Sequence, residues 1–486
     1  MGRFFFTPFL FVLLVASTAY GEGTDNDQSD VVSVRGPAPA SGDWHFDFHG
    51  FLRAPMRVGM SKNENAGPGQ SKINFHEPRV PDDQYLSWLY TRNQERAWGE
   101  AFLSYGNGTV TGTLGVQAYN FTDATWNDQD AQLGISQGWV TWQPDVGLAG
   151  ARLVWKVGSF WNRYGGAGKY DAGQYDTYAF GRTHAMGETV RGEYDISDAT
   201  TLGIEHGIGT KPAHPAVTPR NRFTLLHHAH IDGQYQKRVR VGAHYLSAWT
   251  QDSNPTETVP DGRVTVTGVD ARVDGGLLGE LYLAYSNIKA SNATVVAPAI
   301  EVLHALGGQY FGLGITENYL GPNSGGNGNI GTLIVQYDFS FGLLYRNLRR
   351  PGTEFYGDGP NCTVSLFGMY TSVASDDPVF DGTKKLKYGG EVIYTPISWF
   401  GTGIRGDRVM PSSKDTTQSF SVVSPKVFFH SRFITHEQMS IVYSKYFYGR
   451  NPPAPAGPIS PYGYGAPGIT GGPDENVFKI QATIWW

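Results

Sequence analysis

The chain has 486 residues, a net charge of −6 and a single cysteine, and only 17% of its residues are charged. One thiol excludes a fold held by internal disulfides, and the acidic balance argues against nucleic-acid binding. The most apolar internal stretch, 294–315, is interrupted by Glu301 and His304, which excludes a helical membrane protein. Abundant glycine and aromatic residues (63 Gly, 27 Tyr, 27 Phe and 12 Trp) indicate a mostly β protein.

Residues 1–21 have the layout of a secretory signal peptide. Arg3 supplies a positive start, 4–16 form an apolar run, and Ala19-Tyr20-Gly21 fits a cleavage site. An uncleaved anchor helix is the alternative, but the run is short of the roughly 20 residues that a spanning helix needs. We therefore expect an exported protein in which 22–43, rich in Asp, Ser, Gly and Pro, form a flexible leader.

The first alternating segment begins at Trp44 and predicts a β-strand with one apolar and one polar face. The apolar face carries Phe46, Phe48, Leu52, Ala54, Met56 and Val58. The polar residues His49, Arg53 and Arg57 lie on the opposite face. We expect these three to line the lumen if the sheet closes into a barrel.

The same alternation recurs to the C-terminus and accommodates 18 strands, with 16 left open, because a bacterial barrel needs an even number. The expected strands are 44–59, 84–105, 109–121, 132–143, 151–160, 187–196, 199–209, 222–233, 238–250, 262–273, 278–289, 329–345, 361–373, 384–395, 399–409, 419–432, 437–449 and 476–486. Most are long enough to span a membrane, since strands of about 9–11 residues cross the hydrocarbon at a tilt.

The connections between these segments alternate between short and long. This asymmetry is typical of bacterial outer-membrane barrels, which have short periplasmic turns and long outer loops. The segment 346–360 has to be a long inner turn for the alternation to hold. The sequence therefore predicts, over 44–486, a single antiparallel transmembrane β-barrel of 16–18 strands around a water-filled lumen.

Three short motifs resemble catalytic or metal-binding patterns. The G-x-S-x-G match at 134–138 lies inside an alternating strand, whereas a nucleophile elbow needs a strand-to-helix turn. In the histidine cluster at 227–230 only His228 and His230 share a strand face, and no third ligand is placed. A surface Ca²⁺ site at 127–130 stays open. We expect no catalytic residues, no metal and no cofactor.

The connection 161–186, after the fifth expected strand, is the candidate constriction of the pore. Its charges of both signs are Arg163, Lys169, Asp171, Asp176 and Arg182. Its aromatic residues, the candidate solute contacts, are Trp161, Tyr164, Tyr170, Tyr175 and Tyr178. In a lumen of reduced dielectric, facing charges would screen ionic solutes, and aromatic faces beside polar groups would suit sugar rings. The alternative is an ordinary solvated outer loop.

Two segments carry a resemblance to a known family. Residues 47–53, Asp-Phe-His-Gly-Phe-Leu-Arg, resemble the first strand of maltoporin-like sugar porins. Residues 157–163, Val-Gly-Ser-Phe-Trp-Asn-Arg, are similar to the end of that family's fifth strand and the entry to its constriction loop. The resemblance implies a trimeric pore with an aromatic track for sugars, and it puts Trp161, Arg163 and Tyr164 near the constriction. The paired cysteines of that family's first outer loop are absent from this sequence.

The closing segment 476–486 has the cleanest alternation in the chain. Its apolar residues are Phe478, Ile480, Ala482, Ile484 and Trp486. An aromatic C-terminal residue resembles the signal that the barrel-insertion machinery reads. Trp486 is therefore expected to serve assembly and to close the barrel against the strand that starts near Trp44.

These features favour a Gram-negative outer-membrane porin that allows passive diffusion of small hydrophilic solutes, with sugars among the candidates. The expected partners are outer-membrane lipid, the insertion machinery and those solutes, with a homotrimer as one assembly state and no nucleic acid. The alternatives are an outer-membrane barrel enzyme, for which no convincing catalytic set is found, and a soluble exported carbohydrate-binding β protein. A gated receptor would need a plug domain much larger than 22–43.

Overall fold

The computed structural model describes most of the chain after residue 43. The described residues are 44–62, 66–76, 85, 97–119, 132–164, 169–170, 175–176, 181–212, 223–251, 262–291, 327–349, 360–376, 378, 381–410, 413–414, 419–431, 436–448 and 474–486. The expected signal peptide, 1–21, and leader, 22–43, lie outside this part. Among the described residues, no helix combines the length and the apolar character needed to cross a membrane.

The described chain is mostly strand. The strands are β1 (His45–Lys62), β2 (Ile73–His76), β3 (Trp98–Gly106), β4 (Val110–Tyr119), β5 (Gln132–Trp142), β6 (Ala151–Tyr164), β7 (Lys169–Tyr170), β8 (Tyr175–Asp176), β9 (Gly181–Ser197), β10 (Thr200–Pro212), β11 (Phe223–Tyr235), β12 (Val239–Gln251), β13 (Gly262–Asp274), β14 (Glu280–Ser291), β15 (Gly328–Ser340), β16 (Asn361–Ser375), β17 (Lys384–Ile397), β18 (Phe400–Met410), β19 (Phe420–Ser431), β20 (His436–Tyr448) and β21 (Asp474–Trp485). Two short helical segments accompany them, the 3-10 turn η3 (Gly276–Leu278) and the helix α3 (Phe341–Arg349).

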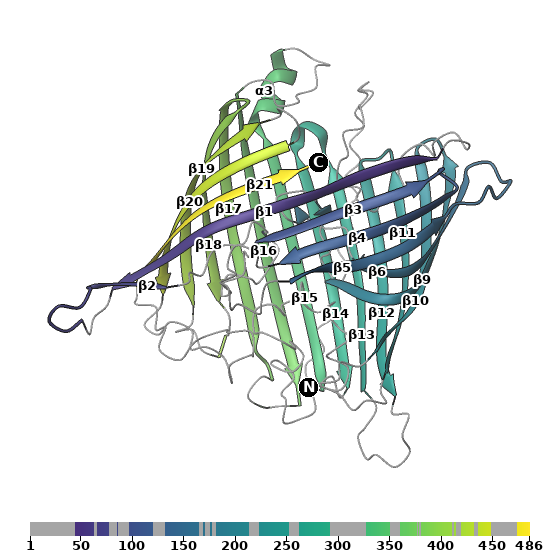
Figure 1. Ribbon diagram of the computed structural model, residues 1–486, viewed down its shortest axis with the longest axis horizontal. Coiled ribbons are helices and arrows are strands. Elements are labelled where there is room, and N and C mark those ends of the chain that lie inside the picture. Colours follow the sequence, from purple (N-terminus) through teal and green to yellow (C-terminus); the bar gives the residue numbers. More distant parts are fainter. Residues whose placement is uncertain are drawn as a thin grey trace, which may run out of the picture.

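Eighteen of these strands form one closed antiparallel ring, which confirms the favoured strand number. Each barrel strand pairs with the next along the chain, and β1 closes the ring by pairing with β3 and β21. The Trp486 N–H donates to the Gly50 carbonyl at 3.1 Å, and the Gly50 N–H donates to the Trp486 carbonyl at 3.0 Å. Strand β2 pairs with the end of β1, and β7 and β8 form a separate ribbon. In Figure 1, β1, β3 and β4 run obliquely across the near side while β13 to β17 stand more upright.

The two ends of the barrel differ, as the loop lengths predict. At the end where β1 begins, short turns join most strands, such as 107–109 and 236–238. Helix α3 also lies at this end, in the longer connection between β15 and β16 (Figure 1). Strand β15 was expected to continue to 345 but ends at Ser340, whose Oγ accepts the Leu343 N–H at 3.2 Å. A serine in this position caps a helix N-terminus, which explains why the strand stops there.

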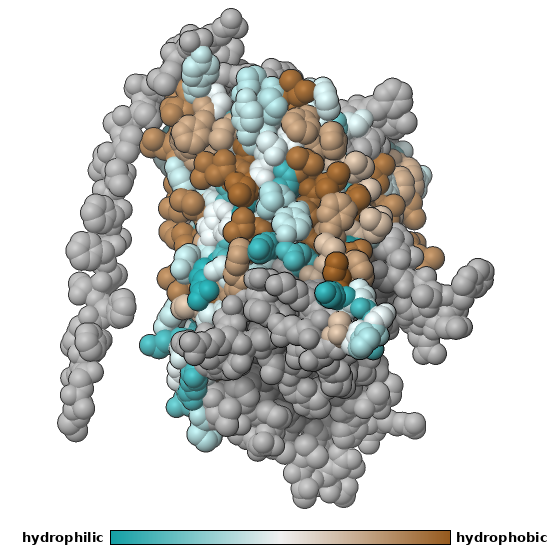
Figure 2. Space-filling model, turned by 90° about the vertical axis from the view of Figure 1, so that its left-hand side faces the viewer, coloured by the Kyte–Doolittle hydropathy of each residue, from teal (hydrophilic) through white to brown (hydrophobic). Residues whose placement is uncertain are grey.

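Outward-facing side chains on the barrel are apolar and exposed. Met56, Ile204 and Leu366 are 55%, 55% and 52% exposed. Exposed aromatic residues near the short-turn end are Trp142, Tyr194, Tyr235, Tyr394 and Trp399, and those toward the other end are Tyr370, Tyr388, Tyr443 and Phe447. Figure 2 shows apolar side chains gathered on one side of the barrel, bordered by hydrophilic ones. An apolar belt between two aromatic girdles is the surface of a transmembrane barrel.

Inward-facing side chains divide the interior of β11 to β16 into two zones. In the half nearer the long connections they are buried and uncharged. Most are apolar, as at Leu226, Leu246, Val264, Val266, Ile288, Ile330, Ile334 and Val373, and threonines lie among them, as at Thr224, Thr250, Thr332 and Thr371. In the half nearer the short turns they are polar or charged, as at His228, Asp232, Asp270 and Gln336. The charged lining on this side is therefore concentrated in one half of the barrel.

Two differences from the predicted strand bounds affect the site. The second barrel strand, expected from 84, begins at Trp98 in β3. The fifth barrel strand, β6, continues to Tyr164, and the sixth, β9, already begins at Gly181. The connection expected at 161–186 therefore spans only 165–180. Backbone pairing does not require alternating side chains, so the ladder between β6 and β9 continues past the point where the hydrophobic pattern ends.

Candidate functional site

A charged network lines the interior of β9 to β12. Arg191 donates from Nη2 to Asp232 Oδ1 at 2.9 Å and from Nε to Glu193 Oε1 at 2.8 Å. Arg240 Nε lies 3.5 Å from the second Asp232 oxygen. Asp232 is almost fully buried, so these two guanidinium groups compensate a carboxylate that burial alone would destabilise. Gly203 makes room for the network, because a Cβ at that position would overlap Arg191 and Asp232.

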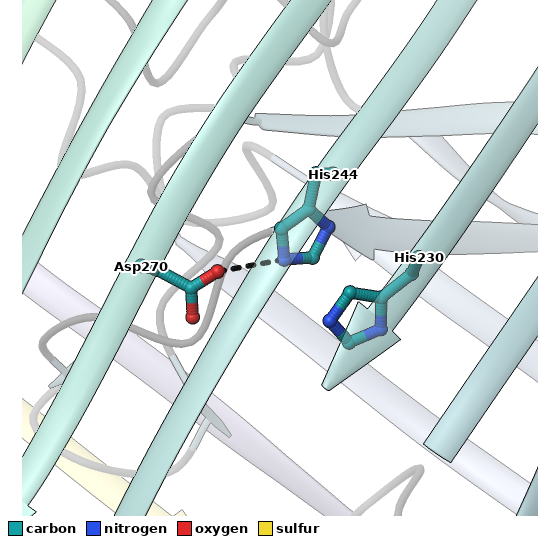
Figure 3. A group of neighbouring side chains, drawn as sticks. All are labelled: His230, His244 and Asp270. Carbon is teal, nitrogen blue, oxygen red and sulfur yellow. Dashed lines mark ion pairs between the residues drawn. The ribbon is translucent and has the colours of Figure 1, made fainter. Parts of the chain in front are cut away.

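Three histidines extend this network along the same wall. His228 Nε2 lies 2.8 Å from Glu205 Oε1. His230 and His244 are opposite each other in the register of β11 and β12, and their rings stack with centroids 3.9 Å apart and 13° between the planes. Beyond them, His244 Nε2 lies 2.8 Å from Asp270 Oδ1 on β13 (Figure 3). His228 and His230 share the inner face as predicted, whereas His244 and Asp270 were missed because only strand pairing brings them beside His230.

The opposite part of the ring, from β17 to β21, is basic. Its inward cations are Lys385, Lys387, Arg405, Lys426 and Lys479. Lys426 Nζ lies 2.5 Å from Glu391 Oε1, and Arg405 donates from Nε and Nη2 to Asp407 at 2.9 and 3.1 Å. We call this surface the basic wall. The inner face of β9 to β13, where Arg191 and Arg240 lie among four carboxylates, is the acidic wall; the carboxylates are Glu193, Glu205, Asp232 and Asp270.

Tyr85, from the connection between β2 and β3, lies against the basic wall. Its hydroxyl donates to Glu391, and its ring stacks on Phe367 with centroids 4.6 Å apart and 10° between the planes. The Arg405 guanidinium lies 5.1 Å from the centroid of the same ring. The prediction that a strand starts at residue 84 is therefore wrong. An aromatic residue in an alternating stretch of sequence predicts a strand. Only the tertiary contacts show that Tyr85 packs inside the barrel.

The three residues predicted on the inner side of the first strand lie on one face of β1. Arg53 is 7% exposed, whereas the adjacent Leu52, on the other face, is 38% exposed. His49 Nδ1 lies 2.7 Å from Asp47 Oδ2 on the same face. Arg57 lies eight residues after His49 and four after Arg53, so the alternation puts it on the same face. Their contribution to solute passage stays a prediction.

The residues predicted at the constriction are placed by their backbone alone. Four lie in barrel strands, namely Trp161, Arg163 and Tyr164 in β6 and Arg182, opposite Arg163, in β9. Four form the ribbon, in which Lys169 pairs with Asp176 and Tyr170 with Tyr175. Asp171 and Tyr178 lie outside the described residues, as do the side chains of the other eight. The role of this segment in the pore therefore stays a prediction.

The remaining sequence motifs do not form a second site among the described residues. Ser136, the central residue of the G-x-S-x-G match, lies within β5, and its hydroxyl donates to the Gly115 carbonyl at 3.3 Å. This motif is therefore part of the barrel wall and not a strand-to-helix turn. The candidate Ca²⁺ segment, 127–130, lies outside the described residues.

No protein-family model and no curated protein matches the chain. Solved structures with a related backbone include the outer membrane channel DcaP of Acinetobacter baumannii (10% identity, 92% of this chain and 100% of that chain, TM-score 0.39). Others are OccK11 (OpdR) of Pseudomonas aeruginosa (9% identity, 90% and 95%, TM-score 0.39) and an anion-selective porin from Comamonas acidovorans (7% identity, 91% and 100%, TM-score 0.36). Similarity at this level does not assign a function. The resemblance to maltoporin-like sugar porins stays a prediction.

Proposed function

We propose that the chain is an outer-membrane porin through which small hydrophilic solutes diffuse passively. The observation that carries this proposal is the closed 18-stranded ring with an apolar outside and charged walls inside. Rows of exposed aliphatic side chains such as Met56 and Leu366 are unfavourable in water and favourable in lipid. Barrels of about 16–18 strands are also wide enough to enclose an aqueous channel.

The acidic and basic walls suit selection among charged and dipolar solutes. They lie on opposite parts of the 18-stranded ring. Strand β11, in the acidic wall, is the eighth barrel strand, and β20, in the basic wall, is the seventeenth, so they are nine strands, or half the ring, apart. In a narrow lumen of reduced dielectric, opposite charges on facing walls create a transverse field. Such a field orients dipolar solutes and slows ions of either sign, so selectivity in this proposal resides mainly in the two walls.

Two segments narrow the lumen in this proposal. One contains Tyr85, whose contacts with Glu391, Phe367 and Arg405 support an inward course of the first long connection. The other is 161–186, whose charges and aromatic residues motivate the prediction. An aromatic face beside a guanidinium and a carboxylate is a combination that binds sugar rings and their hydroxyls. Sugars are therefore among the solutes to be tested.

The location and partners follow from the same proposal. The protein is exported through the segment 1–21 and resides in the outer membrane of a Gram-negative cell, where lipid contacts the apolar belt. Trp486 serves as the residue that the insertion machinery reads. A homotrimer is the proposed assembly, in keeping with the resemblance to trimeric sugar porins.

Reconstitution of the full-length protein into planar bilayers tests this function. We expect steady, ohmic conductance steps in KCl, and solute-dependent current blocking if sugars bind in the lumen. Conductance without any sugar-dependent blocking would support the proposal of a porin and disprove the proposal that it selects sugars. Protein that is folded, as shown by heat-modifiable gel migration, but does not conduct would disprove the proposal and return the barrel enzyme to consideration.

A further inference from the structure

We propose that His230, His244 and Asp270 bind one divalent transition-metal ion, such as Zn²⁺ or Ni²⁺, on the acidic wall. The three residues come from the neighbouring strands β11, β12 and β13, and one ligand atom from each lies within 4.8 Å of the other two. In Figure 3 the three side chains lie side by side, with the Asp270 carboxylate directed at the His244 ring and the His230 ring next to it. This metal-binding proposal is independent of the proposed porin function, because the ligands are present whether or not solutes pass through the barrel.

The donor set matches the chemistry of borderline divalent ions. Imidazole nitrogens and a carboxylate oxygen are common ligands of Zn²⁺, Ni²⁺ and Cu²⁺, whereas Ca²⁺ and Mg²⁺ prefer oxygen alone. Three protein ligands leave one or more coordination positions for water. Such a position would face the lumen, where the ion could exchange with solution.

His230 is oriented as a metal ligand. Its side chain is only 9% exposed, and its Nδ1 lies 3.6 Å from Asp232 Oδ1. This distance is slightly longer than a hydrogen bond, and a small approach of Asp232 would let its carboxylate accept the Nδ1 proton and leave the other nitrogen for the metal. Within the described part of the chain, that second nitrogen, Nε2, is buried and has no hydrogen-bond partner. A buried nitrogen of this kind is unfavourable unless an ion or a water completes its environment.

Two glycines leave space between the ligands. Gly242 is paired with Asp270, and a Cβ added to it would lie 3.0 Å from His230 Nε2 and 3.1 Å from Asp270 Oδ1. Gly268 is paired with His244 and likewise has no side chain. Because residue 242 is glycine, no side-chain atom occupies this point, which lies about 3 Å from both His230 Nε2 and Asp270 Oδ1.

Binding requires a small rearrangement of the side chains. Ligands about 2.1 Å from a tetrahedral zinc ion lie roughly 3.4 Å from one another. The 2.8 Å contact between His244 Nε2 and Asp270 Oδ1 must therefore lengthen slightly. One of the two stacked rings must also turn about χ2, so that a nitrogen of each points at the same position. This torsion is soft in histidine, and Gly268 leaves room for the movement.

The charge of the acidic wall favours a cation at this place. The side chains of His244 and Asp270 are 7% and 4% exposed, so water screens the carboxylate only weakly. A divalent cation bound there would compensate the negative charge of the Asp270 carboxylate.

Isothermal titration of Zn²⁺ into the full-length, chelator-treated protein in detergent tests the site. We expect one ion per chain, and affinity at least tenfold weaker in His230→Gln, His244→Gln and Asp270→Asn. Co²⁺ provides a second readout, because its visible absorption reports nitrogen and oxygen coordination directly. The matched controls are His228→Gln, on the same inner face, and His227→Gln, whose Nε2 lies 2.8 Å from His206 Nε2 on the outside of the barrel. Neither control should change the affinity.

Gly242→Ala keeps the proposal testable even if a ligand variant fails to fold. It retains all three ligands and places a methyl group in the space between them, so Zn²⁺ binding should weaken while heat-modifiable migration stays normal. The proposal is overturned if the wild-type protein shows no saturable binding, or if binding survives His230→Gln and is lost in either histidine control. Binding in detergent does not require conductance, so this result and the porin test can fail independently.

Discussion

At the residue scale, the interior of the barrel is built from charges that are compensated by close neighbours. Arg405 and Asp407 are two residues apart on one strand and therefore share a face. Arg191 and Asp232 come from strands that are not adjacent, with β10 between them, and meet over the position of Gly203. The pair of Arg191 and Asp232 therefore depends on the register of β9, β10 and β11. It also requires a glycine at position 203, because a side chain there would occupy the space between the two groups.

Trp486 is the residue whose role in assembly can be tested directly. Its backbone pairs with Gly50, and its ring lies 5.5 Å from that of Phe48 on β1. Trp486→Ala removes this aromatic contact and should lower the free energy of unfolding by about 1 kcal/mol. If the residue also serves as the insertion signal, the rate of assembly in cells should fall more than the stability does.

Trp44→Ala is the matched control for this prediction. Trp44 is also exposed and aromatic, and it stacks on Tyr105 at 5.1 Å, but it lies at the junction of β1 with β3. Urea unfolding and the appearance of the heat-modifiable band after induction measure the two effects. Equal assembly rates for both variants would argue against a special role for the C-terminal residue.

At the element scale, Tyr85 is a point of contact between the first long connection and the basic wall. Strand β2 pairs with the end of β1, and the next barrel strand, β3, begins at Trp98. Tyr85, between them, contacts residues of β16, β17 and β18. Tyr85 therefore follows the first strand closely in sequence but packs against strands that lie several places away in the ring.

Loss of the Tyr85 contacts should widen the lumen. A hydrogen bond to a charged group contributes roughly 1.5–3 kcal/mol and an aromatic pair about 0.5–1.5 kcal/mol, so Tyr85→Ala should detach this residue from the wall. We expect a larger single-channel conductance with more frequent current fluctuations, and an intermediate effect for Tyr85→Phe, which retains the ring. Tyr388→Ala, exposed on the outside of β17, is the control. An unchanged conductance in Tyr85→Ala would show that this contact does not limit the pore.

At the scale of the whole molecule, the barrel separates charge across its interior. The acidic wall is formed by strands near the middle of the chain and the basic wall by strands near its C-terminus. Closure of the ring places the two walls opposite each other. Neither wall by itself would create a transverse field, so the selectivity that we propose is a property of the closed barrel.

Neutralising part of the basic wall should shift ion preference toward cations. At roughly 10 Å in a half-aqueous lumen, one charge contributes about 1 kcal/mol, so Arg405→Gln with Lys426→Gln should change the permeability ratio by a factor of about five or more. Reversal potentials in a KCl gradient measure the change. Arg408→Gln is the matched control, because Arg408 lies on the outer face of the same strand, opposite the exposed Tyr388. A shift of equal size in the control would place the selectivity elsewhere.

Much of the fold could be predicted because the barrel depends on a pattern that each strand carries in itself. The alternation of apolar and polar residues along strands such as β1 and β13 identifies the lipid-facing side, and the count of such segments leads to 18 strands. Closure by the segment ending at Trp486 follows from the same count. The end of β15 at Ser340 was missed because a local cap replaced the strand there.

The candidate site could be predicted only in part, since its groups meet through pairing between strands. The sequence by itself determined that His228 and His230 share a face and that the first strand has a polar side with Arg53. Only the tertiary structure decided that His244 and Asp270 stand beside His230, that Tyr85 packs inside the barrel, and that two charged walls face each other. The physical reason is that periodicity sets which side of the sheet a residue faces, whereas register and closure set its neighbours.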